Sequence, residues 1–483
     1  MHNRISQASS RQPNFLRAAG HFTRFMPAAP WFKTITLGML VCFLHNVISC
    51  SAGFIDGRLQ RDQQDDRIDQ QDSGSVAPPF DLEIHIASFD TVWSTIRDSH
   101  WDEELTGSQW DEARDNYRPR VERATSAEQV RSIINEMINS LQLSHYGIIP
   151  ASSYDVVKDG LERGGDGDAG LTFRLVGDQV VVSEVRKDSP AMRMGVKPGW
   201  VLKSMADRDV AFVMERLQQA VHGPMRLETL AGLTFTDLAS GAPGSTKNFK
   251  MIDLEYREQN LDLVLELSPG ELVKFGHLPE LRLHYESATL ADNIGYFRFN
   301  AFMNPVQLIP EFRKVIRDEA HHAGIIIDLR GNIGGVAGMT MGMASEFSNQ
   351  QTSLGTMTMK GSKLNFFVNA NQDPVNAPLA ILIDECSISS AEIFSGGLQD
   401  LKLARLFGAR TAGLALPSVV IKLPNGDGFQ YALADYHSVS GRSLEMEGVL
   451  PDEPIALTRE KLAQDADPVL SRAIEWIKQQ TER

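Results

Sequence analysis

The feature that most constrains this chain is a change of hydrophobic period inside residues 378–400. Residues 379–383 form a short, uninterrupted apolar run with β-branched members, which is typical of a buried strand. From Ser390 onward the apolar residues recur at helical spacing, so a helix follows. A strand that leads directly into a helix predicts an α/β arrangement with its chemistry at the strand end.

Three serines, Ser387, Ser389 and Ser390, stand at this junction. A hydroxyl here lies beside the free backbone N–H groups of a helix N-terminus, where an anion is favoured. α/β hydrolases place their nucleophile at such a junction. Serine is also a common helix N-cap, so the junction alone leaves both interpretations open.

Size and charge limit the class of protein. A chain of 483 residues predicts two or three domains, and 42% hydrophobic with 23% charged residues is typical of globular proteins. The net charge is −15 and the basic residues of the body are scattered, which argues against a nucleic-acid partner. Only one of the three cysteines, Cys386, lies in the body, so we expect neither an intramolecular disulfide nor a metal site with Cys/His spacing.

Residues 1–53 are predicted to be a signal segment. A basic stretch without acidic residues precedes a mostly apolar run over residues 34–48, which is typical of a secretory signal. The four residues that end at Cys50 resemble a lipoprotein cleavage box with Cys50 as the lipidated residue; ordinary cleavage just after it and a retained anchor are the alternatives. We therefore expect export to the periplasm or cell envelope. Residues 54–79 are polar and predict a flexible linker.

Residues 80–150 predict a helical N-terminal subdomain. Its second helix, over residues 126–143, opens with the capping-box pattern Ser126-Ala-Glu-Gln129 and carries an apolar face. It is followed directly by Ser144 and His145. Taken alone, this pair has the ordinary role of capping a helix end.

Residues 155–240 predict a β-rich module that resembles a PDZ domain. The resemblance rests on a loop followed by Ser189-Pro-Ala and by glycines at 195 and 199; the loop residues are Gly170, Leu171, Thr172 and Phe173. It implies that the amides after Gly170 receive a peptide carboxylate while a strand edge pairs with the peptide. A role as hinge or spacer is the alternative.

Residues 241–483 predict an α/β core. Two strands, at about 250–257 and 262–267, precede a buried strand over residues 324–330 that ends in Asn-Ile-Gly-Gly at 332–335. Glycines there let backbone N–H groups approach a ligand closely. The loop lacks the Gly-Lys-Ser/Thr of a P-loop and the spacing of a dinucleotide site, so we do not expect phosphate binding.

The ordered motifs of the core resemble those of the C-terminal processing, or tail-specific, serine protease family. They are Asp328-x-Arg-x-Asn-x-Gly-Gly335, Ser387-x-Ser-x-x-Glu-Ile-Phe394, Leu398-Gln-Asp400 and Gly448-Val-x-Pro-Asp452. The resemblance runs from about residue 85 to 475, and the joint match is far more specific than any single motif. It implies a multi-domain α/β protein with a mixed sheet and helices in a crotonase-like, ClpP-like core.

Carried over by motif, the nucleophile of the family falls on Ser389. The oxyanion donors fall on the backbone N–H of Gly335, or its neighbour Gly334, and on that of Ser390. Many members use a lysine base about 25 residues after the serine, and here Leu414 stands at that place. Since leucine accepts no proton, the chain is either inactive or uses another base.

The tricorn-like branch of the family uses a Ser-His pair after the N-terminal helices and a glutamate shortly before the last motif. Ser144 and His145 match the pair, and Glu445 matches the glutamate, with Glu447 as the alternative. The resemblance implies that His145 takes the proton of Ser389 while Ser144, held by Glu445, orients the imidazole. It implies no metal and no cofactor.

These observations predict an exported serine endopeptidase that cleaves peptides or unfolded proteins through an acyl-enzyme. Its expected partner is a polypeptide substrate, its contact with a membrane is limited to the leader or a lipid anchor, and oligomers are compatible with the pattern. The alternative, motivated by Leu414, is a catalytically inactive protein of the same fold that binds peptides or other ligands. A small-ester hydrolase would share the serine and the histidine but would give no reason for a PDZ-like module.

Overall fold

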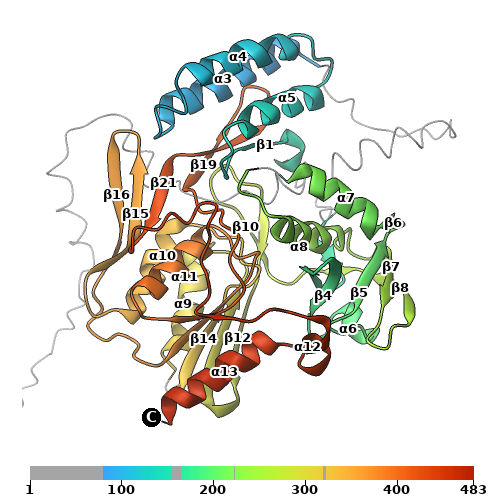
Figure 1. Cartoon of the computed structure of the whole chain (residues 1–483), viewed down its shortest axis with the longest axis vertical. Coiled ribbons are helices and arrows are strands. Elements are labelled where there is room, and N and C mark those ends of the chain that lie inside the picture. Colours follow the sequence, from blue (N-terminus) through green and yellow to red (C-terminus); the bar gives the residue numbers. More distant parts are fainter. Residues whose placement is uncertain (1–79, 155–164, 222, 319–322, 483) are drawn as a thin grey trace, which may run out of the picture. The chain divides into compact units, whose positions relative to one another are not determined.

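The computed structural model describes residues 80–154, 165–221, 223–318 and 323–482 (Figure 1). The predicted signal segment with Cys50 and the predicted linker over 54–79 lie outside these ranges. Of the helices within them, none is both long enough and apolar enough to cross a bilayer.

Three N-terminal helices form the first helical layer: α3 (Leu82–Ser99), α4 (Ser108–Val121) and α5 (Ala127–Asn139). They pack their apolar faces on one another and on Phe429 of a strand in the C-terminal half. Half of the expected capping box is present: Gln129 N–H donates to Ser126 Oγ at 3.2 Å, whereas the Gln129 side chain accepts from Thr125 N and not from Ser126 N. The helix ends at Asn139, four residues before the expected end, because the chain then turns through Gln142, whose φ is +55°.

A short strand carries the chain from these helices into the core. Strand β1 (Gly147–Ile149) pairs antiparallel with β20 (Gly428–Ala432), which pairs in turn with β19 (Ser418–Lys422). Ser144 and His145 lie directly before β1. This pairing therefore fixes the position of the Ser-His pair relative to the C-terminal half of the chain.

The β-rich module is a twisted antiparallel sheet in the order β3-β4-β5-β7-β8, with β6 paired to β5. Its strands are β3 (Leu171–Val176), β4 (Gln179–Val185), β5 (Val201–Met205), β6 (Arg208–Asp209), β7 (Thr246–Ile252) and β8 (Glu258–Val264). Its helices are α6 (Pro190–Arg193), α7 (Val210–Ala220) and α8 (Leu227–Leu238). The expected boundary at residue 240 falls between α8 and β7, yet β7 pairs with β5, so two strands that we assigned to the core complete this sheet instead.

The central sheet of the core has the order β12-β13-β14-β17-β18-β22. Its strands are β12 (Tyr285–Leu290), β13 (Ile294–Phe299), β14 (Gly324–Asp328), β17 (Leu379–Ile383), β18 (Arg405–Gly408) and β22 (Glu453–Pro454). Only β12 runs antiparallel to its neighbour, and all other pairs are parallel. The prediction of a mixed α/β fold is confirmed.

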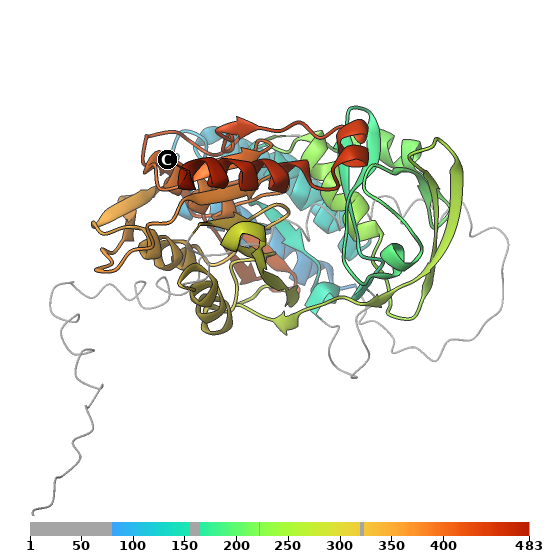
Figure 2. The ribbon, with the colours of Figure 1, turned by 90° about the horizontal axis from the view of Figure 1, so that it is seen from below.

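Helices cover both faces of this sheet (Figure 2). Helices α9 (Pro305–Ile316), α10 (Ala337–Ala344) and α11 (Ser390–Asp400) pack on the face that includes Ile325, Ile327, Ile381 and Ile383. Helix α13 (Pro468–Thr481) packs on the opposite face, against Ile326, Ala380 and Leu382. Because alternate residues of a strand point to opposite faces, strands buried on both sides are apolar throughout.

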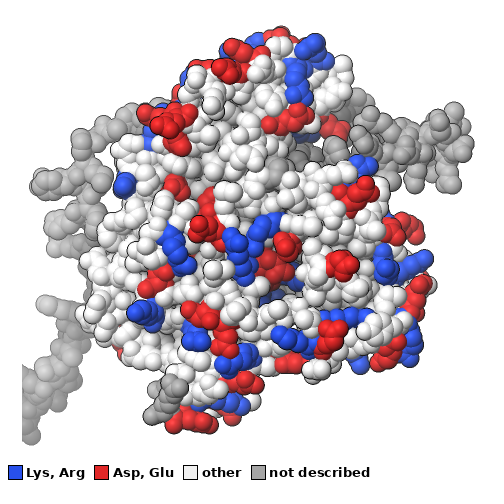
Figure 3. All heavy atoms as spheres, viewed as in Figure 1, with Lys and Arg blue, Asp and Glu red and all other residues white. Residues whose placement is uncertain are grey.

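Smaller elements complete the described chain. They are the sheet β16-β15-β21, built from β16 (Ser362–Val368), β15 (Thr352–Met359) and β21 (Ala434–Ser438), the pair β10 (Glu271–Val273) and β11 (Leu281–Leu283), the pair β2 (Gly167–Asp168) and β9 (Glu266–Leu267), and helix α12 (Arg459–Gln464). On the face seen in Figure 3, acidic and basic side chains are interspersed. That face therefore presents no extended field of a single sign.

Candidate active site

The strand-to-helix junction lies where the sequence places it, between β17 and α11. Ser389 occupies the N-cap position of α11 with φ 57° and ψ −116°, a conformation that costs free energy for any residue with a side chain. Two contacts hold it there, because its N–H lies 3.0 Å from both Leu414 O and Glu392 Oε2. Backbone strain that is fixed in this way is common at functional sites.

The hydroxyls of the two neighbouring serines are committed to the backbone. Ser387 Oγ donates to Leu329 O at 2.7 Å and accepts from Asp384 N at 3.0 Å. Ser390 Oγ donates to Gly335 O at 2.6 Å. Ser389 is the most exposed of the three serines, at 7% against 0% and 1%. The geometry therefore favours Ser389 among the three candidates.

The glycine loop lies directly against this junction. A Cβ added to Gly334 would lie 2.7 Å from Ile388 O and 2.8 Å from Ser389 Cβ, so only glycine fits. Gly334 N–H donates to Asn332 Oδ1 at 2.9 Å and is thereby occupied. Within the described ranges, neither Gly335 N–H nor Ser390 N–H donates to a protein acceptor. Of the predicted oxyanion donors, these last two are the ones left for a ligand.

Ser144, His145 and Glu445 meet in one hydrogen-bonded chain. Ser144 Oγ lies 2.7 Å from His145 Nδ1 and donates to Glu445 Oε2 at 2.8 Å, and Ser144 N–H donates to Glu445 Oε1 at 2.7 Å. A hydroxyl has one proton, and Ser144 gives it to Glu445. The contact with His145 therefore requires a proton on Nδ1, which makes Nε2 the basic nitrogen of the imidazole. The alternative residue Glu447 is exposed and takes no part in this chain.

Burial shifts the pKa of both titratable members of this chain. Burial lowers the pKa of His145 from its usual 6.5 to about 3, so the ring is neutral. Burial raises the pKa of Glu445 from 4.5 to about 7, against the opposing effect of its hydrogen bonds from Ser144. The carboxylate also accepts from Ala415 N at 3.1 Å.

Leu414 and Ala415, which are consecutive, connect the junction at Ser389 with the carboxylate of Glu445. Leu414 O accepts from Ser389 N at 3.0 Å, while Ala415 N donates to Glu445 Oε2. The junction that carries Ser389 and the carboxylate that holds Ser144 are thus bonded to adjacent peptide units. Elements from three distant parts of the chain are brought to one place.

Arg330 and Asp328 form an ion pair beside the glycine loop. Arg330 Nη2 lies 2.6 Å from Asp328 Oδ2 and 2.7 Å from Asp467 Oδ2. Burial opposes ionisation of Asp328, but the charges of Arg330 and Arg298 lower its pKa to about 2. Cys386 is buried, and burial raises the pKa of its thiol well above the usual value, so the thiol stays protonated and unreactive.

The predicted peptide-binding loop of the β-rich module is already bonded within the chain. Gly170 N–H donates to Asp168 Oδ1 at 2.7 Å, and Phe173 N–H donates to Thr236 Oγ1 at 3.1 Å. Leu171 and Thr172 lie between them at the start of β3. Binding of a peptide carboxylate at this loop stays a prediction, and it would have to displace these contacts.

Two protein-family models match parts of this chain. Residues 293–455 match the model of peptidase family S41, and residues 87–139 match that of the tricorn protease C1 domain. The chain thus contains a peptidase S41 domain over residues 293–455 and a tricorn C1 domain over residues 87–139. The predicted family is thereby confirmed, whereas the matched ranges do not include residues 155–240, so the PDZ-like nature of that module stays a prediction.

Several curated proteins resemble this chain. It is 25% identical to tricorn protease homolog 2 of Streptomyces coelicolor over 80% of this chain and 32% of the relative. It is 24% identical to the "Probable CtpA-like serine protease" of Staphylococcus haemolyticus over 58% of this chain and 50% of the relative. It is 23% identical to the carboxyl-terminal-processing protease of Synechocystis over 75% and 79%. The chain thus spans only about a third to a half of the first two relatives.

Solved structures show the same fold. The photosystem II D1 C-terminal processing protease aligns with a TM-score of 0.53 and 19% identity over 80% of this chain and 97% of that chain. Mature CPAF aligns with a TM-score of 0.56 and 13% identity over 82% and 97%. At these identities the likeness is one of fold.

Leu414 occupies a buried position with no exposed surface and packs among apolar residues of the β-rich module. Its backbone, however, takes part in the site through Ser389 N–H. The amide of Leu414 also donates to Glu392 Oε2 at 3.0 Å. The residue contributes its peptide group and not its side chain.

The site residue that sequence reasoning missed is Glu392. Its fully buried carboxylate accepts four hydrogen bonds, from Ser389 N, Thr411 Oγ1, Gly413 N and Leu414 N. Its place in the first turn of a helix suggests by itself only a favourable interaction with the helix dipole. The spacing Ser389-x-x-Glu392 is that of a capping box, and this signal could have placed the carboxylate on the Ser389 N–H.

Proposed function

We propose that this chain is an exported serine endopeptidase that cleaves peptides or unfolded proteins through an acyl-enzyme, with Ser389 as nucleophile and His145 as general base. The observation that carries the proposal is the chain His145–Ser144–Glu445, tied by Ala415 and Leu414 to the junction that holds Ser389. It supplies an alternative to the lysine base that position 414 lacks.

The proposed chemistry is ordinary acyl transfer. His145 Nε2 takes the proton of Ser389 Oγ as the oxygen attacks the scissile carbonyl, and the imidazolium then gives it to the leaving amine. A water repeats the cycle on the acyl-enzyme. Ser144, bonded to Glu445, fixes the ring and the tautomer and stabilises the charge that forms on it.

The tetrahedral oxyanion would be held by the amides of Gly335 and Ser390. Both belong to elements with little freedom, because the glycine loop packs on the junction and Ser390 opens α11. Loss of one such donor typically raises the barrier by about 3–4 kcal/mol. The proposed step needs no metal and no cofactor.

The same proposal includes export of the protein and the roles of its leader and its linker. The leader over residues 1–53 would direct the protein to the periplasm or cell envelope, with Cys50 as the lipid-bearing residue of the anchored form. The linker over 54–79 would then hold the helical, β-rich and α/β parts away from the membrane surface.

A second candidate function is supported by two observations. Leu414 replaces the lysine, and His145 and Ser389 are both buried, at 1% and 7% exposure. A protein of this fold without catalytic activity would bind peptides or other ligands and would not turn them over.

A serine-reactive phosphonate, read by mass spectrometry, separates the two functions. The proposed peptidase predicts a phosphonylated Ser389 in the wild type, much slower labelling in His145→Ala and none in Ser389→Ala. Ser440→Ala, which removes an exposed serine, is the matched control and should label as the wild type does. Absence of label on Ser389, with measurable peptide binding, would establish the second function.

A further inference from the structure

Helix α8 closes the outer edge of the β-rich module. Strand β3 is an edge strand of its sheet, bonded to β4 on one side only. On its other side, Phe173 N–H donates to Thr236 of α8, and Phe173 O accepts from Arg174 Nη1 at 2.8 Å. The edge at which a peptide strand would be added is therefore already satisfied by the chain itself.

Helix α8 is a permanent part of this packing and not a loosely docked segment. Seven consecutive residues, 229–235, are buried, so the helix is enclosed on all sides. A Cβ on Gly232 would lie 2.9 Å from Cys386 Sγ and 3.5 Å from Phe173 O, which shows how closely α8 fits between β3 and the catalytic junction. A ligand site in this module must therefore lie away from this edge.

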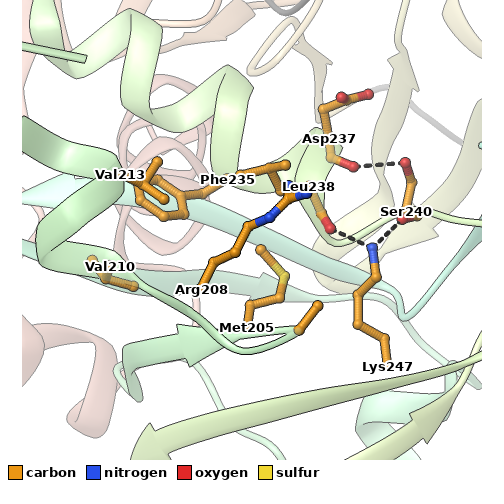
Figure 4. A pocket seen from close by; sticks show the side chains of 10 residues that line it. Met205, Arg208, Val210, Val213, Phe235, Asp237, Leu238, Ser240 and Lys247 are labelled. Carbon is orange, nitrogen blue, oxygen red and sulfur yellow. Dashed lines mark hydrogen bonds between the residues drawn. The ribbon is translucent and has the colours of Figure 1, made fainter. Parts of the chain in front are cut away.

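A cavity lies between α7, the C-terminal turn of α8 and strands β5 to β7 (Figure 4). Its volume is about 250 Å³, and its apolar lining is formed by Met205, Val210, Val213, Phe235 and Leu238. An apolar cavity of about 150 Å³ is large enough to hold benzene. This cavity can therefore accept an apolar group of the size of a leucine or phenylalanine side chain.

Two basic side chains, Arg208 and Lys247, also line the cavity. Figure 4 shows both reaching from their strands toward the C-terminal turn of α8. The Lys247 ammonium donates to Leu238 O and Ser240 O, which accounts for two of its three protons. Burial lowers the pKa of Lys247, and the nearby charge of Arg208 lowers it further. Two close cations beside an apolar cavity favour an anionic group at its mouth.

One acidic residue, Asp237, lines the same cavity. Burial raises the pKa of its carboxyl group, and the charge of Lys247 opposes this shift. The two positive charges of Lys247 and Arg208 exceed the single negative charge of this carboxylate. Removal of the Asp237 charge should therefore strengthen the attraction for an anion.

We propose that this cavity binds a carboxylate carried on a short apolar group, with the apolar group against Phe235 and Val213 and the carboxylate on Arg208 and Lys247. Such a group is found both in a small free acid and at the C-terminal end of a polypeptide. The site is separate from the loop at 170–173 and from the junction at Ser389. It goes beyond the proposed peptidase activity and does not depend on it.

The test uses the full chain with Ser389→Ala, so that no probe is hydrolysed. Titration calorimetry would compare N-acetyl-leucine with N-acetyl-leucinamide, and a leucine-ended peptide with its amidated form. We expect each acid to bind at least tenfold more tightly than its amide. If only the peptide acid binds, the source is a chain end; if the small acid binds equally well, the source is a free acid.

Matched variants assign the site. Arg208→Gln should weaken binding of the acid at least tenfold, and Asp237→Asn should strengthen it. Arg216→Gln removes the same charge from α7 outside the cavity and should leave binding unchanged. Lys247→Gln repeats the test at the second cation, with the melting temperature measured because Lys247 also bonds the end of α8.

Hydrogen exchange locates the bound probe independently of any variant. Protection of residues 205–213 and 235–247 supports the proposal. Protection confined to residues 170–173, equal affinity for acid and amide, no measurable binding of either acid, or equal effects of Arg208→Gln and Arg216→Gln would each overturn it. None of these outcomes bears on catalysis by Ser389, so the proposed function is tested separately.

Discussion

Ser144 and Glu445 lie 301 residues apart in the chain and are joined by two hydrogen bonds, of 2.7 Å from the Ser144 N–H and 2.8 Å from its hydroxyl. The bidentate contact leaves the serine oxygen a single orientation, toward His145 Nδ1. A glutamate thus orients the imidazole without touching it, through one intervening hydroxyl. In the proposed mechanism, this hydrogen-bonded chain takes the place of the lysine that position 414 lacks.

The first prediction concerns the pH dependence of peptide cleavage. Of the three groups bonded to the Glu445 carboxylate, two are backbone N–H donors and the third is the Ser144 hydroxyl, so a protonated Glu445 would donate to Ser144 Oγ and turn the Ser144 proton toward His145 Nδ1. The imidazole would then carry its proton on Nε2, which could no longer act as the base. Because the pKa of Glu445 is raised to about 7, kcat/KM should increase with pH through about 7. Glu445→Gln should remove this increase of kcat/KM with pH and lower kcat by about a hundredfold or more. The control Glu447→Gln, at an exposed position, should keep the increase of kcat/KM with pH.

The second prediction concerns stability against pH. The pKa of His145 is lowered to about 3, so between pH 6.5 and 3 the unfolded chain binds a proton that the folded chain excludes, and stability is lost as pH falls. The pKa of Glu445 is raised, so between pH 4.5 and 7 the folded chain holds a proton that the unfolded chain releases, and stability is lost as pH rises.

These two effects oppose each other between pH 4.5 and 6.5. Glu445→Gln removes one of them, so the melting temperature of this variant should fall more steeply on acidification than that of the wild type. Thermal unfolding at half-unit steps from pH 7 to 4.5 measures the difference. Parallel curves for the two proteins would show that the pKa of Glu445 is not raised in the folded protein.

The third prediction concerns Glu392 as a positioning residue. Its carboxylate faces four donors, so the amide of Glu392→Gln must turn an NH₂ group toward at least one of them. We expect a loss of about 1–3 kcal/mol in the free energy of unfolding. Because Ser389 and Leu414 lose their common acceptor, kcat should fall while KM changes little.

Glu346→Gln is the matched control for this variant. Glu346 is also a buried carboxylate, but it pairs with Arg313 and Arg317 in another part of the core. Its replacement should cost stability and leave kcat near the wild-type value. Equal losses of kcat in the two variants would show that Glu392 has only a general structural role.

The fourth prediction concerns the glycine loop. Gly334→Ala would place a methyl group 2.7 Å from Ile388 O at a φ of 86°, which displaces the loop from the junction. We expect loss of activity by at least about a hundredfold, measured as the acylation rate with an activated ester. Gly338→Ala, in α10 with no atom closer than 4.0 Å, is the control and should leave acylation intact while raising stability by up to about 1 kcal/mol.

The fifth prediction concerns Leu414. Its side chain is fully buried among apolar residues, so Leu414→Lys must bury a charge at a cost of several kcal/mol. This variant should be less stable and no more active than the wild type. Leu414→Met preserves volume and apolar character and should change both properties little. An increase in kcat in Leu414→Lys would show that a lysine still serves Ser389 in this chain.

The sequence predicted the elements around the nucleophile closely. The apolar run at 379–383 became β17 with the expected limits, and α11 begins at Ser390. Local periodicity was sufficient here because both elements lie in the centre of the core, where pattern and burial coincide. The helix expected over 126–143 instead ended at Asn139, since the apolar residue Leu141 is buried from a turn and not from a helix.

By itself, the sequence determined the period of each buried segment, the glycine loop, the absence of a lysine at 414 and the candidates Ser389, Ser144, His145 and Glu445. Only the tertiary structure decided that Ser387 and Ser390 are bonded elsewhere, that Glu445 and not Glu447 reaches Ser144, and that Glu392 holds the junction. The physical reason is the distance along the chain between the residues that interact. Periodicity and caps depend on neighbours a few residues apart, whereas these contacts depend on the pairing of β1 with β20 and on the path of residues 411–415, which no local pattern encodes.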